Sequence, residues 1–302
     1  MAQAEISSLI SEEPRGTAEN RPILPPGRAA RGLAHPSHLI YTNSMRVLAI
    51  ANHKGGVGKT ATARALGDVL SAMGRRVLLV DNDPQGSLSM SCGLMDASPS
   101  LADVLGGSSP GLLRMGEVIR NVRDGLDLAP SNLALAVVEL GLNERRLREL
   151  VLKKALETVG DAYDVCLIDC APSLALLTVN ALAAAHSCLI PSQPMPVDVA
   201  GVRLFLRTID AIREDVNQDL TILGILLTFY DARLNAHQSA LKAMRAAGWP
   251  VLPVMIGRSV RVGEAAALGE SVITFEEGNP QAAAYQELGK IIDLWLKRSV
   301  KQ

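Results

Sequence analysis

Hydrophobic positions in this 302-residue chain form short continuous runs, separated by segments long enough for helices. Runs rich in Val, Leu, Ile and Ala predict strands over residues 46–51, 76–81, 126–130, 164–169, 187–191, 222–229 and 251–256. Continuous rather than alternating apolar residues are typical of strands that are covered on both faces. The intervening segments predict helices over residues 58–73, 144–159, 174–185, 199–216, 236–247 and 281–297.

Strands that alternate with helices predict an α/β fold, in which a mostly parallel twisted sheet carries helices on both faces. In such sheets ligands bind beyond the carboxyl ends of the strands. Polar residues that directly follow a predicted strand are therefore the candidates for chemistry.

The first 44 residues differ from the rest of the chain. They hold five of the 16 prolines, and their four arginines balance four glutamates without apolar periodicity. A segment of this composition buries too little apolar surface to fold alone. We expect a disordered N-terminal extension over residues 1–44, with a short helical turn or interaction peptide at residues 4–10 as the alternative. One folded domain is expected over residues 45–302.

Composition and charge exclude several classes of protein. The 30 basic and 31 acidic residues leave a net charge of −1, which excludes a polybasic protein but permits a local basic patch. No apolar run reaches the roughly 18 residues that would suggest a membrane span. The four cysteines form no C-x-x-C pair, which favours reduced thiols in a cytoplasmic protein over disulfides or a zinc site.

A glycine-rich loop follows the first predicted strand and opens the first predicted helix, with the sequence Lys54-Gly55-Gly56-Val57-Gly58-Lys59-Thr60. Its ending matches the phosphate-binding pattern G-x-x-x-x-G-K-[ST], whereas the first glycine of that pattern is absent. Glycines let backbone N–H groups converge on phosphate oxygens, and the helix N-terminus adds positive potential. We expect residues 54–60 and Ala61 to bind a nucleotide, with Lys59 at the β- and γ-phosphates and the Thr60 hydroxyl on Mg²⁺.

Lys54 needs a separate explanation, because a second lysine at the start of the loop does not easily reach the phosphates that Lys59 serves. It could instead reach the nucleotide of a neighbouring subunit and offset transition-state charge, as an arginine finger does. The alternative is a solvated loop lysine.

Carboxylates end two further predicted strands. Asp81 and Asp83 lie on a turn after the second strand, and Asp169 ends the apolar run that starts at Val165. Carboxylates beside a phosphate loop suit Mg²⁺ binding and the positioning of water. Taken singly, each could also cap a helix or close a turn. We expect Thr60, Asp81, Asp83 and Asp169 to form the metal site.

These motifs resemble the ParA/MinD family of P-loop ATPases. Lys54–Thr60 is similar to its deviant Walker A motif, Asp81–Gly86 to its D-x-D-P-Q-G segment, and the likeness runs from Met45 to about Leu296. Later blocks favour ParA over MinD. His53, where glutamine is usual, and residues 194–196 depart from the family pattern. The resemblance implies a slow ATPase that uses ATP/ADP and Mg²⁺.

Roles for single residues also follow from the resemblance. Lys54 would be the signature lysine that acts across an ATP-sandwiched homodimer. Asp83 would orient the attacking water, and Asp81 would support the metal shell. Lys54, Lys59 and Asp83 are therefore the expected catalytic residues.

ParA relatives bind DNA non-specifically, which requires cations on phosphates rather than base readers. The resemblance implies a DNA-partitioning ATPase that is stimulated by a ParB-like adaptor, with a cytoplasmic, nucleoid-associated location. The candidate DNA contacts are Arg203, Arg207, Arg213, Arg233, Arg258 and Arg261. The alternative is a positioning switch for a protein cargo, or a membrane-associated regulator whose last helix is amphipathic; docking of that helix on the sheet explains its apolar face equally well.

Overall fold

The computed structural model describes residues 45–106, 113–276 and 278–298. The prediction for residues 1–44 lies outside the described residues and stays a prediction.

Within the described residues the strands form one sheet in the order β3-β4-β2-β5-β1-β6-β7-β8. All neighbours pair in parallel except β3 and β4. The bounds are β1 (Arg46–Ile50), β2 (Val77–Asn82), β3 (Arg120–Arg123), β4 (Leu126–Ala129), β5 (Val165–Cys170), β6 (Ser187–Ser192), β7 (Thr221–Thr228) and β8 (Val251–Ile256). The predicted α/β architecture is confirmed.

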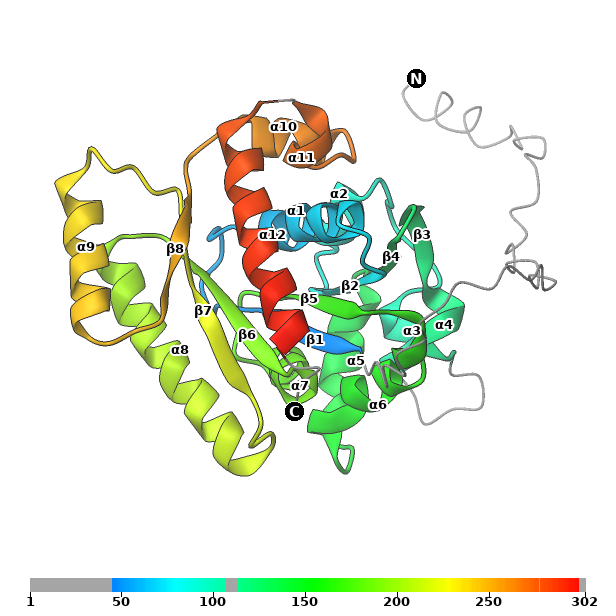
Figure 1. The fold of residues 1–302 in the computed structure, drawn as a ribbon. Coiled ribbons are helices and arrows are strands. Elements are labelled where there is room, and N and C mark those ends of the chain that lie inside the picture. Colours follow the sequence, from blue (N-terminus) through cyan, green and yellow to red (C-terminus); the bar gives the residue numbers. More distant parts are fainter. Residues whose placement is uncertain (1–44, 107–112, 277, 299–302) are drawn as a thin grey trace, which may run out of the picture. The chain divides into compact units, whose positions relative to one another are not determined.

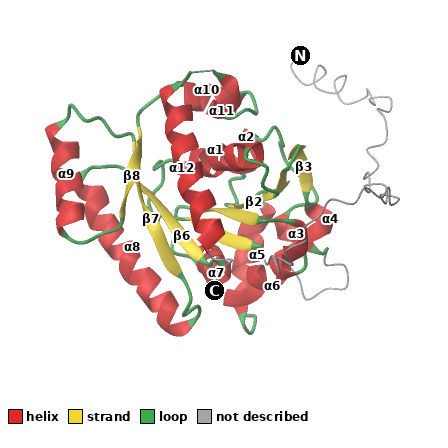
Figure 2. Cartoon of the chain, in the orientation of Figure 1, coloured by secondary structure: helices red, strands yellow, loops and turns green. Residues whose placement is uncertain are grey.

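Helices cover both faces of the sheet, as Figures 1 and 2 show. One face carries α1 (Lys59–Ala72), α2 (Ser87–Ser91), α10 (Arg261–Ala267), α11 (Val272–Phe275) and α12 (Pro280–Arg298). The other carries α3 (Leu101–Leu105), α4 (Met115–Val118), α5 (Ala134–Leu142), α6 (Val151–Glu157), α7 (Leu176–Ala184), α8 (Pro196–Asp215) and α9 (Asn235–Ala246).

Side chains of β1 explain why the strands read as continuous apolar runs. Val47 and Ala49 enter the core beneath α7 and α8, whereas Leu48 and Ile50 enter the core beneath α1 and α12. Successive side chains of a strand point to opposite faces, so a strand between two helical layers needs an apolar residue at every position.

Several short elements were not predicted from the sequence. They are β3, α2, α3, α4, α5, α10 and α11, and none exceeds nine residues. The helix predicted over residues 144–159 is wrong at its start, because the chain there forms a 3₁₀ turn at Arg148–Leu150 and α6 begins only at Val151. Such short segments depend on tertiary packing more than on their own helical propensity.

The last helix packs across α1. Leu288, Ile292 and Leu296 of α12 are buried in the same core as Val69 of α1. This packing buries the side of α12 that carries Leu288, Ile292 and Leu296, whereas Leu294, which shared the apolar face expected from the sequence, is exposed. Among the helices of the described ranges, none is both long enough and apolar enough to pass through a bilayer.

The sheet order places the carboxyl ends of β2, β5 and β1 side by side. Asp169 of β5 is the register partner of Asp81 on β2 and of Ile50 on β1. The glycine loop leaves β1 directly after Ile50. The topology therefore brings the loop and the acidic strand ends to one edge of the sheet.

Candidate nucleotide-binding site

The glycine loop spans residues 51–58 between β1 and α1. Gly56 and Gly58 have φ angles of 70° and 84°, a left-handed conformation that strains residues with a side chain. The Thr228 hydroxyl donates to the Val57 carbonyl oxygen, and the Gln193 side-chain amide donates to that of Gly56, each at 2.9 Å. The ends of β6 and β7 thus hold the loop in shape.

Lys59 begins α1 and is 7% exposed. Its ammonium group donates to the Lys54 carbonyl oxygen at 2.9 Å, so the side chain folds back over the loop. Burial lowers the pKa of Lys59, and Asp169 opposes that shift. The first turn of α1 has no acidic residue and no side-chain cap, which leaves its N–H groups and positive potential available to an anion.

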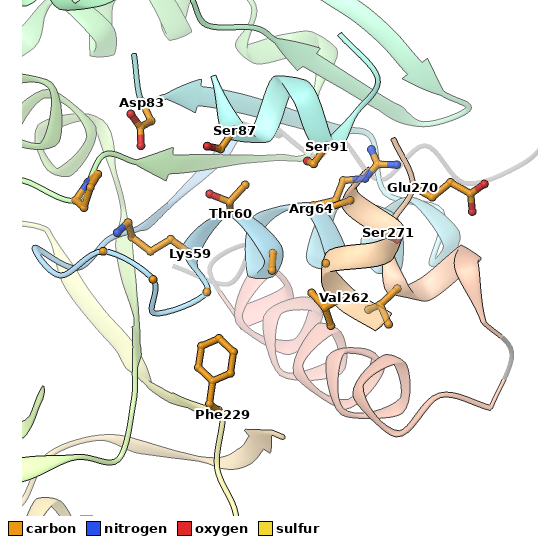
Figure 3. Close-up of a pocket in the computed structure, with 18 residues that line it drawn as sticks. Lys59, Thr60, Arg64, Asp83, Ser87, Ser91, Phe229, Val262, Glu270 and Ser271 are labelled. Carbon is orange, nitrogen blue, oxygen red and sulfur yellow. The ribbon is translucent and has the colours of Figure 1, made fainter. Parts of the chain in front are cut away.

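A cavity of about 470 Å³ opens in front of this loop. Figure 3 shows Lys59 and Thr60 at one end, Asp83 and Ser87 above them, and Phe229 below. Val262 and Glu270, from α10 and the turn after it, close the other end. Phe229 has a φ of 53°, a conformation that a bulky residue adopts only where its surroundings enforce it.

Asp169 lies at the back of the loop and is 1% exposed. Burial raises the pKa of Asp169 well above its usual range, with Asp81 adding to the rise and the Thr60 hydroxyl and Lys59 opposing it. Neither carboxylate oxygen has a hydrogen bond of ordinary geometry within the described residues. A buried carboxylate that the Thr60 hydroxyl and Lys59 only partly compensate suits a cation or its bound water, and Mg²⁺ commonly uses one or two carboxylates together with substrate phosphates. The donors present therefore fit Mg²⁺.

Asp81 and Asp83 take different positions. Asp81 is fully buried and accepts hydrogen bonds from the Ser89 amide at 2.8 Å and the Ser89 hydroxyl at 2.7 Å, which tie the start of α2 to β2. Burial raises the pKa of Asp81 to about 6. Asp83 lines the cavity, and Asp81 is not among the residues that do so. In this structure Asp81 supports the turn that presents Asp83.

Lys54 does not line the cavity either. Its ammonium group forms an ion pair with Asp198 in the first turn of α8. His53 also faces α8, with its ring centroid 6.4 Å from that of Phe205. Burial lowers the pKa of His53, and the Lys59 charge adds to the effect. The structure thus directs both side chains toward α8.

Several supporting residues escaped the sequence reasoning. They are Arg64 at the far end of the cavity, Ser89, Gln193, Asp198 and Thr228. Two sequence signals lay near them: the unusual segment 194–196, beside Gln193 and Asp198, and the block 226–233, which resembles a later ParA block and contains Thr228. The others act through tertiary contacts, which single-sequence patterns do not report.

The six candidate arginines fall into two groups. Arg203 and Arg207 are exposed and lie one turn apart on α8, and Arg258 is exposed after β8. The other three contact nearby acceptors: Arg213 donates to the Leu220 carbonyl oxygen at 2.6 Å, Arg233 pairs with Asp231 at 2.7 Å, and Arg261 pairs with Glu264 at 2.7 Å. Lys242 and Arg245, which the sequence reasoning did not select, are exposed on α9 beside α8.

Comparison with known proteins agrees with this geometry. A family model described as an AAA domain matches residues 45–222. The chromosome partitioning protein ParA of Caulobacter vibrioides is 40% identical over 253 residues, which cover 82% of this chain and 94% of that protein. The sporulation initiation inhibitor protein Soj of Bacillus subtilis is 37% identical over 249 residues, covering 81% and 97%.

A solved structure is similar to this chain in its three-dimensional fold as well as in its sequence. A Mycobacterium smegmatis protein described as cobyrinic acid a,c-diamide synthase, with bound ADP and magnesium, is 37% identical at a TM-score of 0.73 and covers 83% of this chain and 95% of its own. The same protein has been solved with an ATP analogue and magnesium. With a deviant glycine loop, a cavity at the carboxyl edge of the sheet and relatives matched over nearly their whole length, the chain belongs to the ParA family of P-loop ATPases.

Proposed function

We propose that this chain binds Mg²⁺ and ATP in the cavity before the glycine loop, forms an ATP-dependent homodimer, and hydrolyses ATP slowly to control its hold on DNA. One observation carries the proposal: the loop, the buried Asp169 carboxylate and the Asp83 carboxylate meet at one edge of the sheet. Relatives solved with ADP or an ATP analogue and magnesium support it.

Phosphate binding follows from the groups at the start of α1. The loop amides and the N-terminus of α1 attract anionic oxygens, and Lys59 adds a positive charge that is already ordered and largely desolvated. The Thr60 hydroxyl and Asp169 would hold Mg²⁺. When bound, Mg²⁺ offsets the negative charge of the β- and γ-phosphates.

Hydrolysis requires a water in line with the bond that breaks. Asp83 is the carboxylate that faces the cavity, and its Oδ1 is steadied by the Gln85 amide at 2.9 Å. It can accept a hydrogen bond from the attacking water and orient it. Lys59 and the loop amides offset the charge that develops on the phosphoryl oxygens, and Lys54 of the second copy completes that set.

DNA is the molecule that we propose this protein binds under the control of ATP. Arg203 and Arg207 on α8, with Lys242 and Arg245 on α9, supply exposed positive charge without a base-reading pattern. Such charges bind phosphates regardless of sequence. The printed names of the relatives, a chromosome partitioning protein among them, support a role in moving DNA. We propose a cytoplasmic, nucleoid-associated protein whose turnover a ParB-like adaptor stimulates.

Co-sedimentation tests this proposal. The full chain is mixed with duplex DNA or with anionic liposomes, each with ATP, with ADP or without nucleotide. DNA binding should appear with ATP and fall with ADP, while liposome binding should stay low in every condition. ATP-dependent binding to liposomes and not to DNA would refute the DNA output.

The second candidate function is a positioning switch for a protein cargo, or a membrane-associated regulator, with the same ATP chemistry. The membrane version would need an available apolar face on the last helix. Leu288, Ile292 and Leu296 of α12 are already buried against the core beneath α1. Leu294 is the large apolar side chain that α12 leaves exposed within the described residues, and a single such residue favours DNA over a membrane as the binding partner. If neither DNA nor liposomes bound in the co-sedimentation assay, a protein cargo would be the remaining candidate.

A further inference from the structure

The ion pair between Lys54 and Asp198 joins the glycine loop to α8. Asp198 lies in the first turn of α8, and its side chain is 2% exposed, whereas that of Lys54 is 39% exposed. Neither carboxylate oxygen of Asp198 has a hydrogen bond of ordinary geometry within the described residues. The ammonium group of Lys54 is thus the main compensation for a buried negative charge.

Such an arrangement holds the lysine firmly. A buried carboxylate destabilises the folded state unless a cation or hydrogen-bond donors compensate its charge. Removal of the partner would therefore leave an uncompensated buried charge. The backbone of Lys54 is fixed as well, because its carbonyl oxygen accepts the Lys59 ammonium at 2.9 Å and its amide donates to the Asn52 side chain at 3.1 Å. The Lys54 side chain is therefore the part of this residue that can move while both backbone hydrogen bonds stay in place.

The direction of that side chain matters for the dimer. Lys54 is bound to α8 and does not line the cavity of its own subunit. One ammonium group cannot stay on Asp198 and also reach a phosphate in a second subunit. Departure of Lys54 therefore has to precede, or accompany, its action across a dimer.

We propose that Asp198 is a positioning residue that holds Lys54 within its own subunit and so opposes the ATP-dependent dimer until Lys54 is released. The inference rests on the proposed role of Lys54 across that dimer. It predicts that the ion pair between Lys54 and Asp198 must break before two subunits associate, which makes dimerisation less favourable. Loss of the Asp198 charge should remove this free-energy penalty.

A neighbouring contact strengthens the link between loop and helix. Gly201 of α8 lies so close to His53 that an added Cβ would be 2.8 Å from the imidazole Cε1. His53 and Lys54, which are adjacent in the chain, thus both contact the first two turns of α8. The same helix carries Arg203 and Arg207, so the ion pair also connects the loop to the proposed DNA contacts.

The first experiment measures the ion pair without any nucleotide. Lysine acylation of the full chain, followed by mass spectrometry, gives the labelling rate of Lys54 in wild type and in Asp198→Asn. The rate should rise several-fold in Asp198→Asn. Glu287→Gln, which removes the exposed partner of Lys290, should leave it unchanged. An unchanged Lys54 rate in a folded Asp198→Asn protein overturns the proposal. Asp198→Ala serves in place of Asp198→Asn if the latter does not fold.

The second experiment measures dimer formation by sedimentation with a non-hydrolysable ATP analogue and Mg²⁺. Asp198→Asn should dimerise about tenfold more tightly than wild type. In the Lys54→Ala background the same substitution should have no such effect, because the residue that it releases is absent. Weaker dimerisation of Asp198→Asn would overturn the inference but leave the proposed function intact. A wild type that never dimerises with the analogue would overturn both.

Discussion

Lys59 is ordered before any ligand arrives, because its ammonium group is held 2.9 Å from the Lys54 carbonyl oxygen and only 7% of the residue is exposed. Asp169 is also in place, because it lies on β5 with only 1% of the residue exposed. Groups placed in advance lose little freedom when charge develops beside them. At the residue scale the site therefore has the character of a preformed receptor for phosphate.

Lys59→Ala should remove ATP binding, with affinity reduced by roughly a hundredfold, because charge-assisted contacts to the phosphates are lost. Titration calorimetry with ATP and Mg²⁺ checks this. Lys290→Ala, on the exposed side of α12, is the control and should bind normally. Normal ATP affinity in Lys59→Ala would mean that the nucleotide lies elsewhere.

Asp83→Ala should bind ATP as wild type does and lose turnover by roughly a hundredfold or more, because the proposed water loses its orienting acceptor. Phosphate release under saturating ATP is the measurement, and calorimetry supplies the matched affinity. The dimer should also persist longer with ATP. Hydrolysis at the wild-type rate would remove Asp83 from the mechanism.

His186 gives a prediction for pH. Its Nδ1 accepts the Val47 amide at 3.0 Å, and burial lowers the pKa of His186 to about 4. The unfolded chain protonates near the ordinary value, so the stabilising effect is complete above about pH 6.5 and is lost as pH falls toward 4. Wild type should lose roughly 1–3 kcal/mol more than His186→Gln between pH 7 and pH 4, a range discounted for partial exposure of the ring.

Urea unfolding of both proteins at the two pH values gives this difference, and the other titrating groups cancel in the comparison. Equal pH dependence of the two proteins would show that the imidazole titrates alike in the folded and unfolded chain.

At the scale of elements, the contact between α1 and α12 depends on Gly289. A Cβ at that position would lie 2.3 Å from Val69 Cγ1, so the two helices approach more closely than any side chain would permit. Arg75, after α1, also pairs with Asp293 of α12 at 2.6 Å. The C-terminal end of the helix that follows the phosphate loop is thereby fixed against α12.

Gly289→Ala should lower the free energy of unfolding by about 1–3 kcal/mol, because the helices must separate or shift to admit the methyl group. Gly141→Ala in α5 is the matched control, since nothing lies within 4 Å of the added carbon. That control should be neutral or stabilising by up to about 1 kcal/mol. Chemical denaturation measures both, and equal effects would show that the contact has room to relax.

Elements were predictable where their residues alone carry the pattern. Strands that are buried on both faces, such as β1, were predicted because each forms an apolar run in the sequence. The long helices α1, α8 and α12 were predicted within three residues at either end. The edge strand β3, with Asn121 and three partly exposed residues, has no apolar run to detect. The five-residue α2 is held by Asp81 and Ser89 rather than by its own propensity.

At the scale of the whole molecule, the proposed DNA contacts lie on α8 and α9, while the cavity lies at the carboxyl edge of the sheet before α1. The two proposed sites lie on different elements, so under the proposal ATP acts on DNA binding through the dimer and not by direct contact with DNA. A dimer doubles the number of positive charges that can face one duplex, which raises affinity without a new kind of contact.

Arg203→Ala combined with Arg207→Ala should weaken ATP-dependent DNA binding and reduce the slope of log affinity against log salt by about 2 per subunit, roughly one for each lost phosphate contact. Fluorescence anisotropy over a range of NaCl concentrations gives the slope. The control is Arg233→Ala with Arg261→Ala, whose side chains pair with carboxylates. A larger effect of the control pair would move the DNA surface to the loop after β7 and the start of α10.

Sequence alone determined the fold class and the nucleotide chemistry, because apolar runs, glycines and the Gly58-Lys59-Thr60 ending are local signals with local physical causes. It also selected Asp83 and Asp169, since both lie at the carboxyl ends of apolar strands. Only the tertiary structure separated Asp81, bound to Ser89, from Asp83, which faces the cavity. It alone placed Asp198 against Lys54, residues 144 positions apart in the chain. Burial and ion pairing depend on which elements the sheet order brings together, and no window of neighbouring residues contains that information.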